Sequence, residues 1–442
     1  MAQVLMLCHD QHLDRRVVAQ AVTLIEQGHA VHLLALSYNG ETSNEVTVEG
    51  IQLTRIGLND IIPENPTYKG YMARQYKMND WLNWGANRYP QRLGVFQRLF
   101  TLGSKLNWGV YKWLLLARYR NRSLHDPLPF RQAFVKHGMP LKADVVQVHD
   151  LPALEAGAEL AAAWGVPLVY DAHELYPEQK SFSAIQRRIC SSAEADQIKK
   201  ADLVFAVNES IGEEMSRRYG ISKPVTLLNA IDPPVEFDPE ARYDLLREKL
   251  GLSAERRILL FQGGFAPYRN LEFLVEAMAH VKTLDVDLVM MGFGAFGDLL
   301  KMKATKLNLI GKRIHFLPAV PQSELLQHSA SADIGIIPYP HVDLNSYFCT
   351  PNKLFEFIQA GLPILANDSP ELNRFVKLNG FGYSSRMKNS REIARSIDAA
   401  FAQDALTQWR SAIRVRRSEL AWQGQGVIYG QAMQGVLPKN AA

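Results

Sequence analysis

The chain has 442 residues, of which 47% are apolar and 21% are charged, with 29 glycines and 22 prolines. This ordinary globular composition excludes a disordered, collagen-like or disulfide-scaffold protein and predicts two or three domains. The formal net charge is +4. Three well-separated cysteines favour a reducing compartment, and the lack of an apolar run of roughly 18 residues favours a soluble protein. The amino terminus has neither the basic start nor the apolar core of a signal peptide, so we expect an intracellular protein.

The first half of the chain alternates short apolar runs with helical patterns. A strand over residues 4–8, a helix over 14–27 that Gly28 ends, and a strand over 30–35 predict a βαβ unit. Further strands are predicted at residues 144–148, 167–170, 202–207 and 225–228, with a helix over 154–164. Such alternation implies a parallel sheet covered by helices on both faces.

Residues 66–122 interrupt this pattern with an unusual charge balance. The window holds eleven Lys and Arg residues, one acid (Asp80) and four of the seven tryptophans. Cations among Trp and Tyr rings suit an anionic lipid surface, and the same mixture would attract single-stranded nucleic acid. A helical insertion with inward-packed aromatics and solvated charges is a further explanation. We favour the membrane surface and expect no nucleic-acid partner, because no nucleic-acid motif accompanies the patch. The predicted membrane contacts are Trp81, Trp84, Arg88, Trp108, Lys112 and Trp113.

A turn-rich stretch at residues 229–234 precedes a second series of strands. These are predicted at residues 258–262, 287–291, 314–317, 333–337 and 364–366. We therefore expect two doubly wound α/β domains joined near residues 230–240. Ligands of such folds bind at the carboxyl ends of the strands, which would place them in a cleft between the domains.

Two glycine-rich strand ends in the second half predict a phosphate site. Gly263 and Gly264 follow one strand, and Arg269 opens the next helix. Gly292 and Gly294 repeat the pattern after the following strand. Paired glycines let backbone N–H groups approach a phosphate, and a guanidinium can clamp its oxygens. A tight turn would explain one pair, but two in one domain favour a ligand site, although neither is a full Rossmann fingerprint.

The strongest local pattern surrounds one predicted helix. Thr350 is expected to cap this helix, Pro351 to begin it and Gly361 to end it. Its free N–H groups and positive end would stabilise a diphosphate, with Lys353 as an added cation. Glu356 lies among apolar residues, where a carboxylate needs a hydrogen-bond donor such as a ribose hydroxyl. A solvent-facing glutamate on an ordinary helix is the alternative.

These motifs resemble those of the family 4 retaining glycosyltransferases (glycosyl transferases group 1), whose GT-B fold has two Rossmann-like domains facing a cleft. The donor-site signature matches at residues 351–356 and 360–363. Weaker matches keep the family's order at residues 14–17, 28–29, 149–152, 170–175, 208–210 and 229–230. Residues 60–140 resemble no known motif.

The resemblance implies that the chain is divided into three parts. An N-terminal acceptor-binding domain would cover residues 1–232, with the basic aromatic insertion at about 60–140. A C-terminal nucleotide-sugar donor-binding domain would cover residues 233–420, and a helix over residues 421–442 would return to the first domain.

The resemblance also implies roles for single residues. Glu356 would hold the donor ribose, and His149 would lie beside the acceptor and the reacting sugar carbon. His149 also ends a predicted strand, where a catalytic or positioning imidazole belongs, with a packed core histidine as the alternative. The implied catalytic residues are His149, Arg269 and Glu356. The implied donor-binding residues are Gly263, Gly264, Arg269, Gly292, Gly294, Asn352, Lys353, Leu354 and Glu356. The implied acceptor-side residues are Arg16, His149, His173 and Glu174.

The chain departs from the family pattern at the donor site. Phe348 stands where the family has the first acid of an E-x7-E motif, and Gly264 stands where it has a phosphate-binding arginine. Arg269 and Lys353 remain as cations. The candidates to replace the missing acid are Asp343 and Asn345.

No metal or other cofactor is expected. The DxD pattern of Asp285 and Asp287 leads straight into a strand, and His9 and His12 lack an evident third ligand. Cations and the helix end would instead stabilise the charge of the leaving group.

The sequence therefore predicts a retaining, metal-independent glycosyltransferase of hexosyltransferase type, with a UDP- or GDP-sugar as the expected donor substrate. Its acceptor would be lipid-linked or a saccharide in cell-surface polysaccharide biosynthesis. The protein would be cytoplasmic and peripheral on the inner face of the plasma membrane. The alternatives are a sugar-nucleotide epimerase of the same fold and a non-catalytic membrane or saccharide-binding partner with a degenerate donor site.

Overall fold

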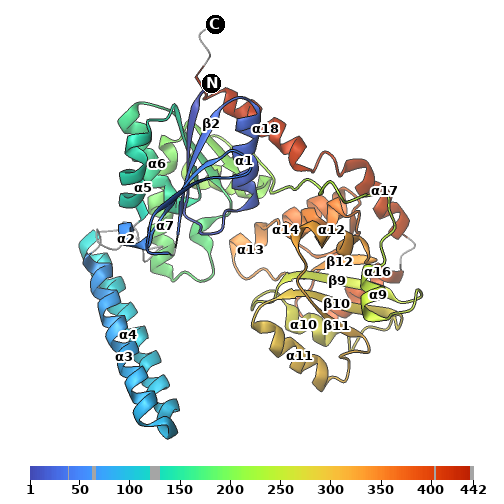
Figure 1. Cartoon of the computed structure of the whole chain (residues 1–442). Coiled ribbons are helices and arrows are strands. Elements are labelled where there is room, and N and C mark those ends of the chain that lie inside the picture. Colours follow the sequence, from blue (N-terminus) through green and yellow to red (C-terminus); the bar gives the residue numbers. More distant parts are fainter. Residues whose placement is uncertain (38, 62–65, 120–129, 403–404, 439–442) are drawn as a thin grey trace. The chain divides into compact units, whose positions relative to one another are not determined.

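The chain forms two α/β units, each built around its own sheet (Figure 1). The computed structural model describes residues 1–442 except 38, 62–65, 120–129, 403–404 and 439–442. Unit 1 comprises Met1–Ala206, Glu214–Val225 and Gly430–Ala442, and unit 2 comprises Val207–Glu213 and Thr226–Tyr429. The predicted class, two parallel-sheet α/β domains, is confirmed.

The described residues of unit 1 form a sheet in the order β3-β4-β2-β1-β5-β6-β7-β8. Its strands are β1 (Gln3–Cys8), β2 (Ala30–Leu36), β3 (Ser43–Val46), β4 (Gln52–Ile56), β5 (Val145–His149), β6 (Leu168–Ala172), β7 (Leu203–Ala206) and β8 (Val225–Thr226). Strand β3 pairs antiparallel with β4, whereas β4, β2, β1, β5, β6 and β7 pair in parallel. The helices of unit 1 are α1 (Arg15–Glu26), α2 (Leu58–Ile61), α3 (Pro66–Arg88), α4 (Leu93–Tyr119), α5 (Phe130–Gly138), α6 (Leu151–Trp164) and α7 (Ala184–Gln197). Helix α8 (Glu209–Tyr219) is divided, with residues 209–213 in unit 2 and residues 214–219 in unit 1.

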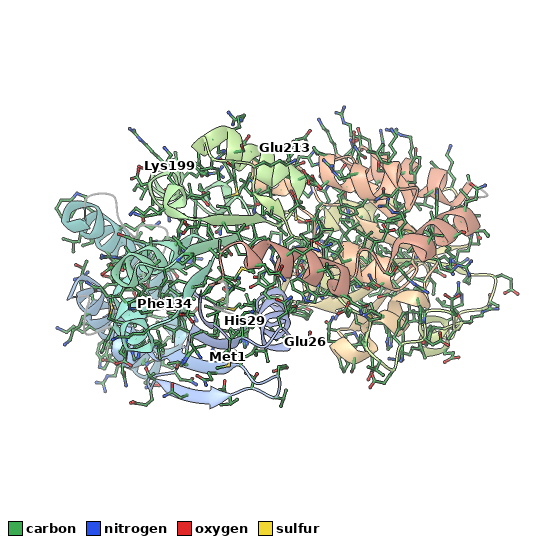
Figure 2. The ribbon with its side chains drawn as sticks, turned by 90° about the horizontal axis from the view of Figure 1, so that it is seen from above. Met1, Glu26, His29, Phe134, Lys199 and Glu213 are labelled. Atoms are coloured by element: carbon green, nitrogen blue, oxygen red, sulfur yellow. The ribbon has the colours of Figure 1, made fainter. Side chains whose placement is uncertain are left out.

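Apolar strands and one-sided helices build the core of unit 1. Five of the six side chains of β1 are buried because helices cover both faces of the sheet, with α1 on one side and α5 and α6 on the other (Figure 1). Helix α1 buries Val17, Ala21 and Leu24 at helical spacing. Asp14 caps it by accepting from the Arg16 N–H at 2.8 Å, so this helix begins one residue after the predicted start at residue 14. Figure 2 shows the end of the sheet at which β1 and β2 begin, near the labelled Met1 and His29.

The sheet of unit 2 has the order β11-β10-β9-β12-β13-β14, and its strands pair in parallel. Its strands are β9 (Arg257–Gly264), β10 (Val286–Phe293), β11 (Ile314–Pro318), β12 (Ile334–Ile337), β13 (Ile364–Asn367) and β14 (Gly382–Ser385). The helices are α9 (Leu245–Leu250), α10 (Leu271–Ala277), α11 (Phe296–Lys306), α12 (Gln322–Ala330), α13 (Leu344–Phe348), α14 (Asn352–Gln359), α15 (Pro370–Asn373), α16 (Ser390–Ala402) and α17 (Leu406–Arg416). Helix α18 (Trp422–Gln434) is divided, with residues 422–429 in unit 2 and residues 430–434 in unit 1.

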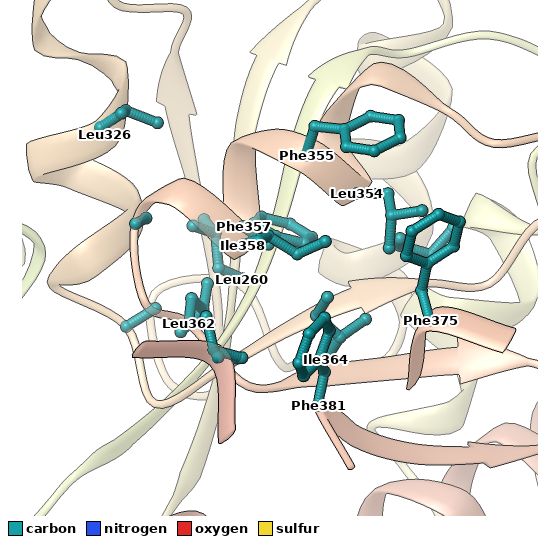
Figure 3. Close-up of a cluster of buried hydrophobic side chains, with 14 of the residues drawn as sticks. Leu260, Leu326, Leu354, Phe355, Phe357, Ile358, Leu362, Ile364, Phe375 and Phe381 are labelled. Carbon is teal, nitrogen blue, oxygen red and sulfur yellow. The ribbon is translucent and has the colours of Figure 1, made fainter. Parts of the chain in front are cut away.

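Strand β9 shows why this sheet is apolar on both faces. Ile258 and Leu260 pack in a cluster with α14, whereas Leu259 and Phe261 pack in a second cluster with α10. Successive side chains of a strand point to opposite faces, so one continuous apolar run serves both cores. Figure 3 shows the first cluster, in which Leu260 lies among side chains of α14 and β13.

Helices α3 and α4 form a hairpin, joined by a short turn at Pro90–Arg92. The described part of the predicted basic aromatic insertion is therefore helical. Arg74 Nε donates to Asn107 Oδ1 at 2.7 Å between the helices, and the Tyr71 and Tyr111 rings are 4.9 Å apart. In Figure 1 the two helices lie side by side and extend away from the sheet of unit 1.

Two of the predicted membrane contacts belong to the inner packing of this hairpin. The Trp108 ring lies 5.7 Å from that of Tyr71 and 5.5 Å from that of Tyr111. Lys112 Nζ lies 5.1 Å above Trp108 and donates to Gln186 on α7 at 3.3 Å. Both side chains are half-buried and are held by these contacts, and their contact with a membrane stays a prediction.

Among the described residues, no helix combines the length and the apolar character that crossing a bilayer requires.

Candidate functional site

The two glycine-rich segments lie side by side at the carboxyl ends of β9 and β10. Gly292 pairs with Gly263 in the parallel register, and a Cβ atom on Gly292 would lie 2.0 Å from the Gly263 carbonyl oxygen. Gly294 has φ +123°, and a Cβ there would lie 2.5 Å from the Phe265 carbonyl. Close strand packing is therefore a sufficient reason for glycine at both Gly292 and Gly294.

Two cations, Arg269 and Lys353, face this end of β9. A Cβ on Gly263 would lie 3.6 Å from Lys353 Nζ, and Arg269 Nη1 donates to the Gly264 carbonyl at 2.9 Å. Tyr339 connects the two cations. Its hydroxyl accepts from Lys353 Nζ at 2.7 Å, and its ring centroid lies 5.4 Å from the guanidinium carbon of Arg269.

Lys353 is a buried cation, with only 5% of its surface exposed. Its Nζ lies 3.8 Å from the centroid of the Phe261 ring. Burial, and then the positive charge of Arg269, hold the pKa of Lys353 well below its usual value. A desolvated ammonium is stabilised by an anion that enters the same space. The end of β9 therefore favours an anionic ligand.

Glu356 is buried on α14, with 9% of its surface exposed. Its Oε2 accepts from Gln262 Nε2 at 2.7 Å, and Gln262 Oε1 accepts from Ser329 Oγ at 2.6 Å. Side chains of β9 and α12 thus orient the carboxylate. The alternative of a solvent-facing glutamate is wrong.

Helix α14 begins one residue later than the sequence predicts. Pro351, not Thr350, is its N-cap residue and supplies no side-chain bond. The Thr350 hydroxyl instead accepts from Asn208 Nδ2 at 3.2 Å, and the same amide donates to the Phe348 carbonyl at 2.8 Å. Because a proline side chain cannot cap, the first turn of α14 keeps N–H groups for a ligand.

The backbone groups predicted to bind the diphosphate differ in their surroundings. The Leu354 N–H donates to the Pro351 carbonyl at 2.8 Å, and the Leu354 side chain is fully buried in the core. Asn352 is exposed at the start of the helix, where its Oδ1 accepts from Asn229 at 2.7 Å. Of these positions at the N-terminal end of α14, Asn352 is therefore the exposed one, whereas Lys353 and Leu354 are buried.

One of the two candidates to replace the missing acid has a structural role. Asp343 accepts from the N–H and the hydroxyl of Ser346, each at 2.6 Å, and so caps α13. Asn345 lies on the same short helix and is partly exposed. Phe348 ends that helix with its ring 5.2 Å from that of Tyr347.

The acids of the DxD pattern both pair with arginines. The two oxygens of Asp287 each accept from Arg256 at 2.7 Å. Those of Asp285 accept from Arg257 at 2.6 and 3.0 Å. Ion pairing at the start of β10 therefore explains this pattern without a metal.

In unit 1, the carboxyl ends of β5 and β6 bring together a buried polar network. His149 ends β5 opposite Asp171 of β6, and His173 follows β6. Asp171 Oδ2 lies 3.3 Å from His149 Nδ1 and 3.1 Å from His173 Nε2. Arg16 Nε and Gln20 Nε2, both on α1, donate to the same oxygen at 3.1 and 2.6 Å. Asp171 is thus the centre of the network.

Burial and charge separate the protonation states of these groups. Burial lowers the pKa of His149, which favours a neutral imidazole at pH 7. Burial opposes ionisation of Asp171 as well, but Arg16 and the imidazoles hold its pKa well below its usual value. Burial likewise disfavours a charged His173, yet Asp150 and Asp171 raise its pKa to about 9. A neutral and a charged imidazole therefore lie side by side, with His149 Nδ1 3.2 Å from His173 Nε2.

Asp150 contacts His173 and itself has an unusual backbone conformation. Asp150 lies at φ 59° and ψ 167°, a region that residues other than glycine rarely adopt. Its carboxylate accepts from the His173 N–H at 2.9 Å, and burial raises its pKa to about 7. Only 1% of the His149 surface is exposed, against 16% of the His173 side chain. His173 is therefore the more accessible of the two imidazoles, and Asp171 contacts both of them.

His149, Asp171 and His173 also offer three ligand atoms within 4.8 Å of one another, a group that the sequence analysis did not find. The Arg16 guanidinium, however, pairs with the same carboxylate. Its positive charge at hydrogen-bond distance disfavours a cation here. We therefore interpret the group as a hydrogen-bond network.

We expect His173→Gln to cost more stability at pH 6 than at pH 10. The pKa of His173 is raised from 6.5 to about 9, so charged His173 stabilises the folded protein below about pH 6.5, and this contribution is lost as the pH rises through about 9. The difference in unfolding free energy between wild type and variant should shrink by roughly 3 kcal/mol over this range. Thermal and urea unfolding at intervals of pH measure it, and a difference that is constant with pH would contradict the assignment.

The predicted site residues thus fall into two groups, one in each unit. Gly263, Gly264, Arg269, Lys353 and Glu356 gather around the end of β9, whereas Arg16, His149 and His173 share the network of unit 1. Glu174 follows this network in sequence, and its Oε1 accepts from Gln179 at 2.5 Å. The residues that sequence reasoning missed are Tyr339, Gln262, Ser329, Gln20, Asp150 and Asp171. Of these, Asp150 and Asp171 adjoin the predicted histidines in the motifs, whereas Tyr339 has no comparable signal.

The sequence matches two family models. One is described as Glycosyltransferase Family 4 and covers residues 87–234, and the other is described as Glycosyl transferases group 1 and covers residues 256–403. Together these ranges span well over half of the chain. The first begins within residues 60–140, the segment that by itself resembles no known motif.

The chain is similar to D-inositol 3-phosphate glycosyltransferase of Xylanimonas cellulosilytica, with 27% identity over 212 residues, 44% of this chain and 50% of the relative. It is 24% identical over 235 residues to chitobiosyldiphosphodolichol beta-mannosyltransferase of Candida albicans, 50% of either protein. The chain thus spans about half the length of these curated relatives.

Among solved structures, Anabaena Alr3699/HepE in complex with UDP and glucose superimposes with a TM-score of 0.61 at 15% identity, covering 98% of this chain and 100% of that chain. This likeness is one of fold, and it agrees with the two parallel-sheet units described here. Together with the two family matches, it shows that the chain is a GT-B protein that belongs to glycosyltransferase family 4, among the group 1 glycosyl transferases.

Proposed function

We propose that the protein is a retaining glycosyltransferase that moves a hexose-type sugar from a nucleotide-sugar to a lipid-linked or saccharide acceptor in cell-surface polysaccharide biosynthesis. The observation that carries the proposal is the pair of cations, Arg269 and Lys353, at the glycine-rich end of β9. Two fixed cations beside an uncapped helix start suit a diphosphate. Membership of the family supports sugar transfer.

In this proposal unit 2 binds the donor. The diphosphate would contact the backbone of Gly263 and Gly264, Arg269, Lys353 and the start of α14. Glu356, whose Oε2 is oriented by Gln262, would accept from the ribose hydroxyls. The complex of Anabaena Alr3699/HepE with UDP supports a UDP-sugar as the first donor to test, with a GDP-sugar second.

The proposed chemistry forms one bond and breaks one at the same sugar carbon. The acceptor oxygen would attack from the face on which the diphosphate leaves, and a phosphate oxygen would take the proton of the acceptor hydroxyl. Such a step needs no pair of carboxylates of the kind that glycosidases use. Arg269 and Lys353 would stabilise the charge that develops on the leaving diphosphate, so the proposal requires no metal ion.

In unit 1 the charged His173 would donate a hydrogen bond to the acceptor or to the transferred sugar. His149 and Asp171 would hold its ring and its charge. The name of the Candida albicans relative includes a dolichol diphosphate, which supports a lipid-linked acceptor. We also propose that the protein works in the cytoplasm as a peripheral protein on the inner face of the plasma membrane.

The first experiment is a thermal-shift panel with UDP, GDP, ADP, TDP, CMP and their common sugar conjugates. A ligand at 100 times its dissociation constant adds about 2.7 kcal/mol of stability, which is a readable shift. We expect one nucleotide class to respond. A response followed by conversion of the donor to an isomer without any acceptor would favour the epimerase, and silence across the panel would favour a non-catalytic binding partner.

We expect Glu356→Ala to weaken binding of the responding nucleotide at least tenfold. The change removes the carboxylate that would accept from the ribose, and it leaves the Gln262 amide without this partner. Isothermal titration of wild type and variant measures the effect. Glu248→Ala, at an exposed position on α9, is the matched control and should bind as wild type does. Equal affinity of all three proteins would remove Glu356 from the donor site.

A further inference from the structure

The outer face of α4 carries a row of exposed apolar side chains. Six of them follow each other at intervals of three or four residues, and each is between 48% and 65% exposed. At 3.6 residues per turn these intervals place them on one face of the helix. The row consists of Val95, Leu99, Leu102, Leu106, Val110 and Trp113. The opposite face packs on α3 through residues such as Asn107 and Tyr111. The apolar row is therefore not needed to hold the hairpin together.

Positive charges accompany the apolar row. Arg98 and Lys105 are exposed, lie seven residues apart, and each precedes a leucine of the row, so they line one flank of it. Arg88 and Arg92 are exposed at the turn of the hairpin, beside Trp84 with 55% of its surface exposed. Helix α4 contains no Asp or Glu, and α3 contains only Asp80. The hairpin is therefore both apolar and strongly basic on its surface.

We propose that the apolar row of α4 inserts into the headgroup region of an anionic membrane, with the flanking basic side chains on the lipid phosphates. A helix with an apolar row, a basic flank and exposed tryptophans has the composition of a helix that lies in the plane of a bilayer surface. Each Lys or Arg near an anionic surface adds to the attraction. At 1.5 Å per residue, the 27 residues of α4 are about 40 Å long, enough for many lipid contacts.

Charge and apolar character together favour an anionic membrane over two other possible partners of this helix face, a second copy of the chain and a nucleic acid. A second copy of the chain docked on the same face would bring two basic flanks together with no acid on α4 to pair with them. A nucleic acid would satisfy the cations but not the row of aliphatic side chains, because backbone binding needs cations and rings rather than leucines. An anionic bilayer satisfies both. The inference goes beyond the proposed sugar transfer and does not depend on it.

The test is binding of the full chain to sedimenting vesicles of phosphatidylcholine, alone or with about one third phosphatidylglycerol. Wild type should bind the anionic vesicles at least tenfold more tightly, and this preference should weaken as NaCl rises from about 0.1 to about 1 M. The triple change Leu99→Gln, Leu102→Gln and Leu106→Gln, and separately the pair Arg98→Glu and Lys105→Glu, should each reduce binding at least tenfold.

Matched controls change the same chemistry elsewhere. The pair Arg391→Glu and Arg395→Glu alters charge equally at exposed positions of α16, and Leu284→Gln with Leu378→Gln replaces leucines that are 73% and 78% exposed. Both controls should bind vesicles within twofold of wild type. Circular dichroism and the nucleotide-induced thermal shift, which should be the same for every variant, separate lost docking from lost folding or a lost donor site.

Three outcomes would overturn the proposal. Equal binding to neutral and anionic vesicles would remove the role of the basic flank, and unchanged binding of the α4 variants would remove the role of the row. If the α4 changes instead convert a dimer to a monomer, or abolish binding of a single-stranded oligonucleotide, while vesicle binding stays the same, then a second copy or a nucleic acid is the occupant.

Discussion

Lys353→Met should abolish measurable donor binding, with a loss of turnover of about 10²–10³, while leaving the free protein as stable as wild type or more stable. The buried ammonium lies against Phe261 and Tyr339, and desolvation followed by Arg269 lowers its pKa. Removing it takes out an amine whose charged form burial destabilises in the free protein, but also the group that would face the diphosphate as a cation, where one such group contributes that much rate.

The measurements are thermal unfolding with and without the responding nucleotide, and turnover at saturating acceptor. Lys306→Met, at an exposed position of α11, is the control and should change neither.

A second expected result for Lys353 is proton uptake when the nucleotide binds. Because the pKa of Lys353 is low in the free protein and would rise beside a diphosphate, nucleotide binding should take up a proton, and affinity should fall as the pH rises. Calorimetry in buffers of different ionisation enthalpy detects this uptake. A variant that loses stability but binds nucleotide normally would contradict the role of Lys353.

His173→Gln should lower turnover by about 10²–10³ without changing the affinity for the donor nucleotide by more than about twofold. Because His173 lies in unit 1, whereas the proposed donor groups lie in unit 2, we expect the change to act on the step that would use the acceptor. Since Asp150 and Asp171 raise the pKa of His173 to about 9, wild-type turnover should fall as the pH rises through about 9, and the variant should lack this decline.

A matched control is His328→Gln. His328 is also a buried histidine, 2% exposed, but its partners are Lys249 and the Glu324 carbonyl within unit 2. It should retain most of the turnover and the wild-type decline at high pH. If both histidine variants lose turnover equally, the loss reflects damage to the fold rather than a role of His173 in the reaction.

Local patterns predicted the elements well where burial is continuous. The predicted strand at residues 258–262 is the middle of β9, and the one at 364–366 lies within β13, because apolar runs between two layers of helices leave little ambiguity. Helix α14 begins one residue later than its sequence predicts. Thr350 has a side chain that commonly caps helices. Its hydroxyl instead accepts a hydrogen bond from Asn208, which lies more than a hundred residues earlier in the chain. A propensity for capping cannot anticipate such a distant partner.

The candidate site, like the fold, was predictable from the sequence only in part. Motif order and resemblance singled out Glu356, Lys353 and His149. The sequence did not indicate that Tyr339 links the two cations. Nor did it indicate that Trp108 packs inside the hairpin while Trp113 is 65% exposed. Both tryptophans stand in the same basic aromatic segment, and only the pairing of α3 with α4 distinguishes them.

The sequence by itself therefore determined the alternation of strands and helices, the family signature and the basic character of the insertion. These depend on residues close together in the chain, or on their order along it. The tertiary structure alone decided which groups are buried and with which partner, as in the contact of Gln262 with Glu356 and that of Arg16 with Asp171. Protonation follows from this, because the free energy of a charge depends on the solvent and the counter-charges around it, and those are supplied by distant parts of the chain.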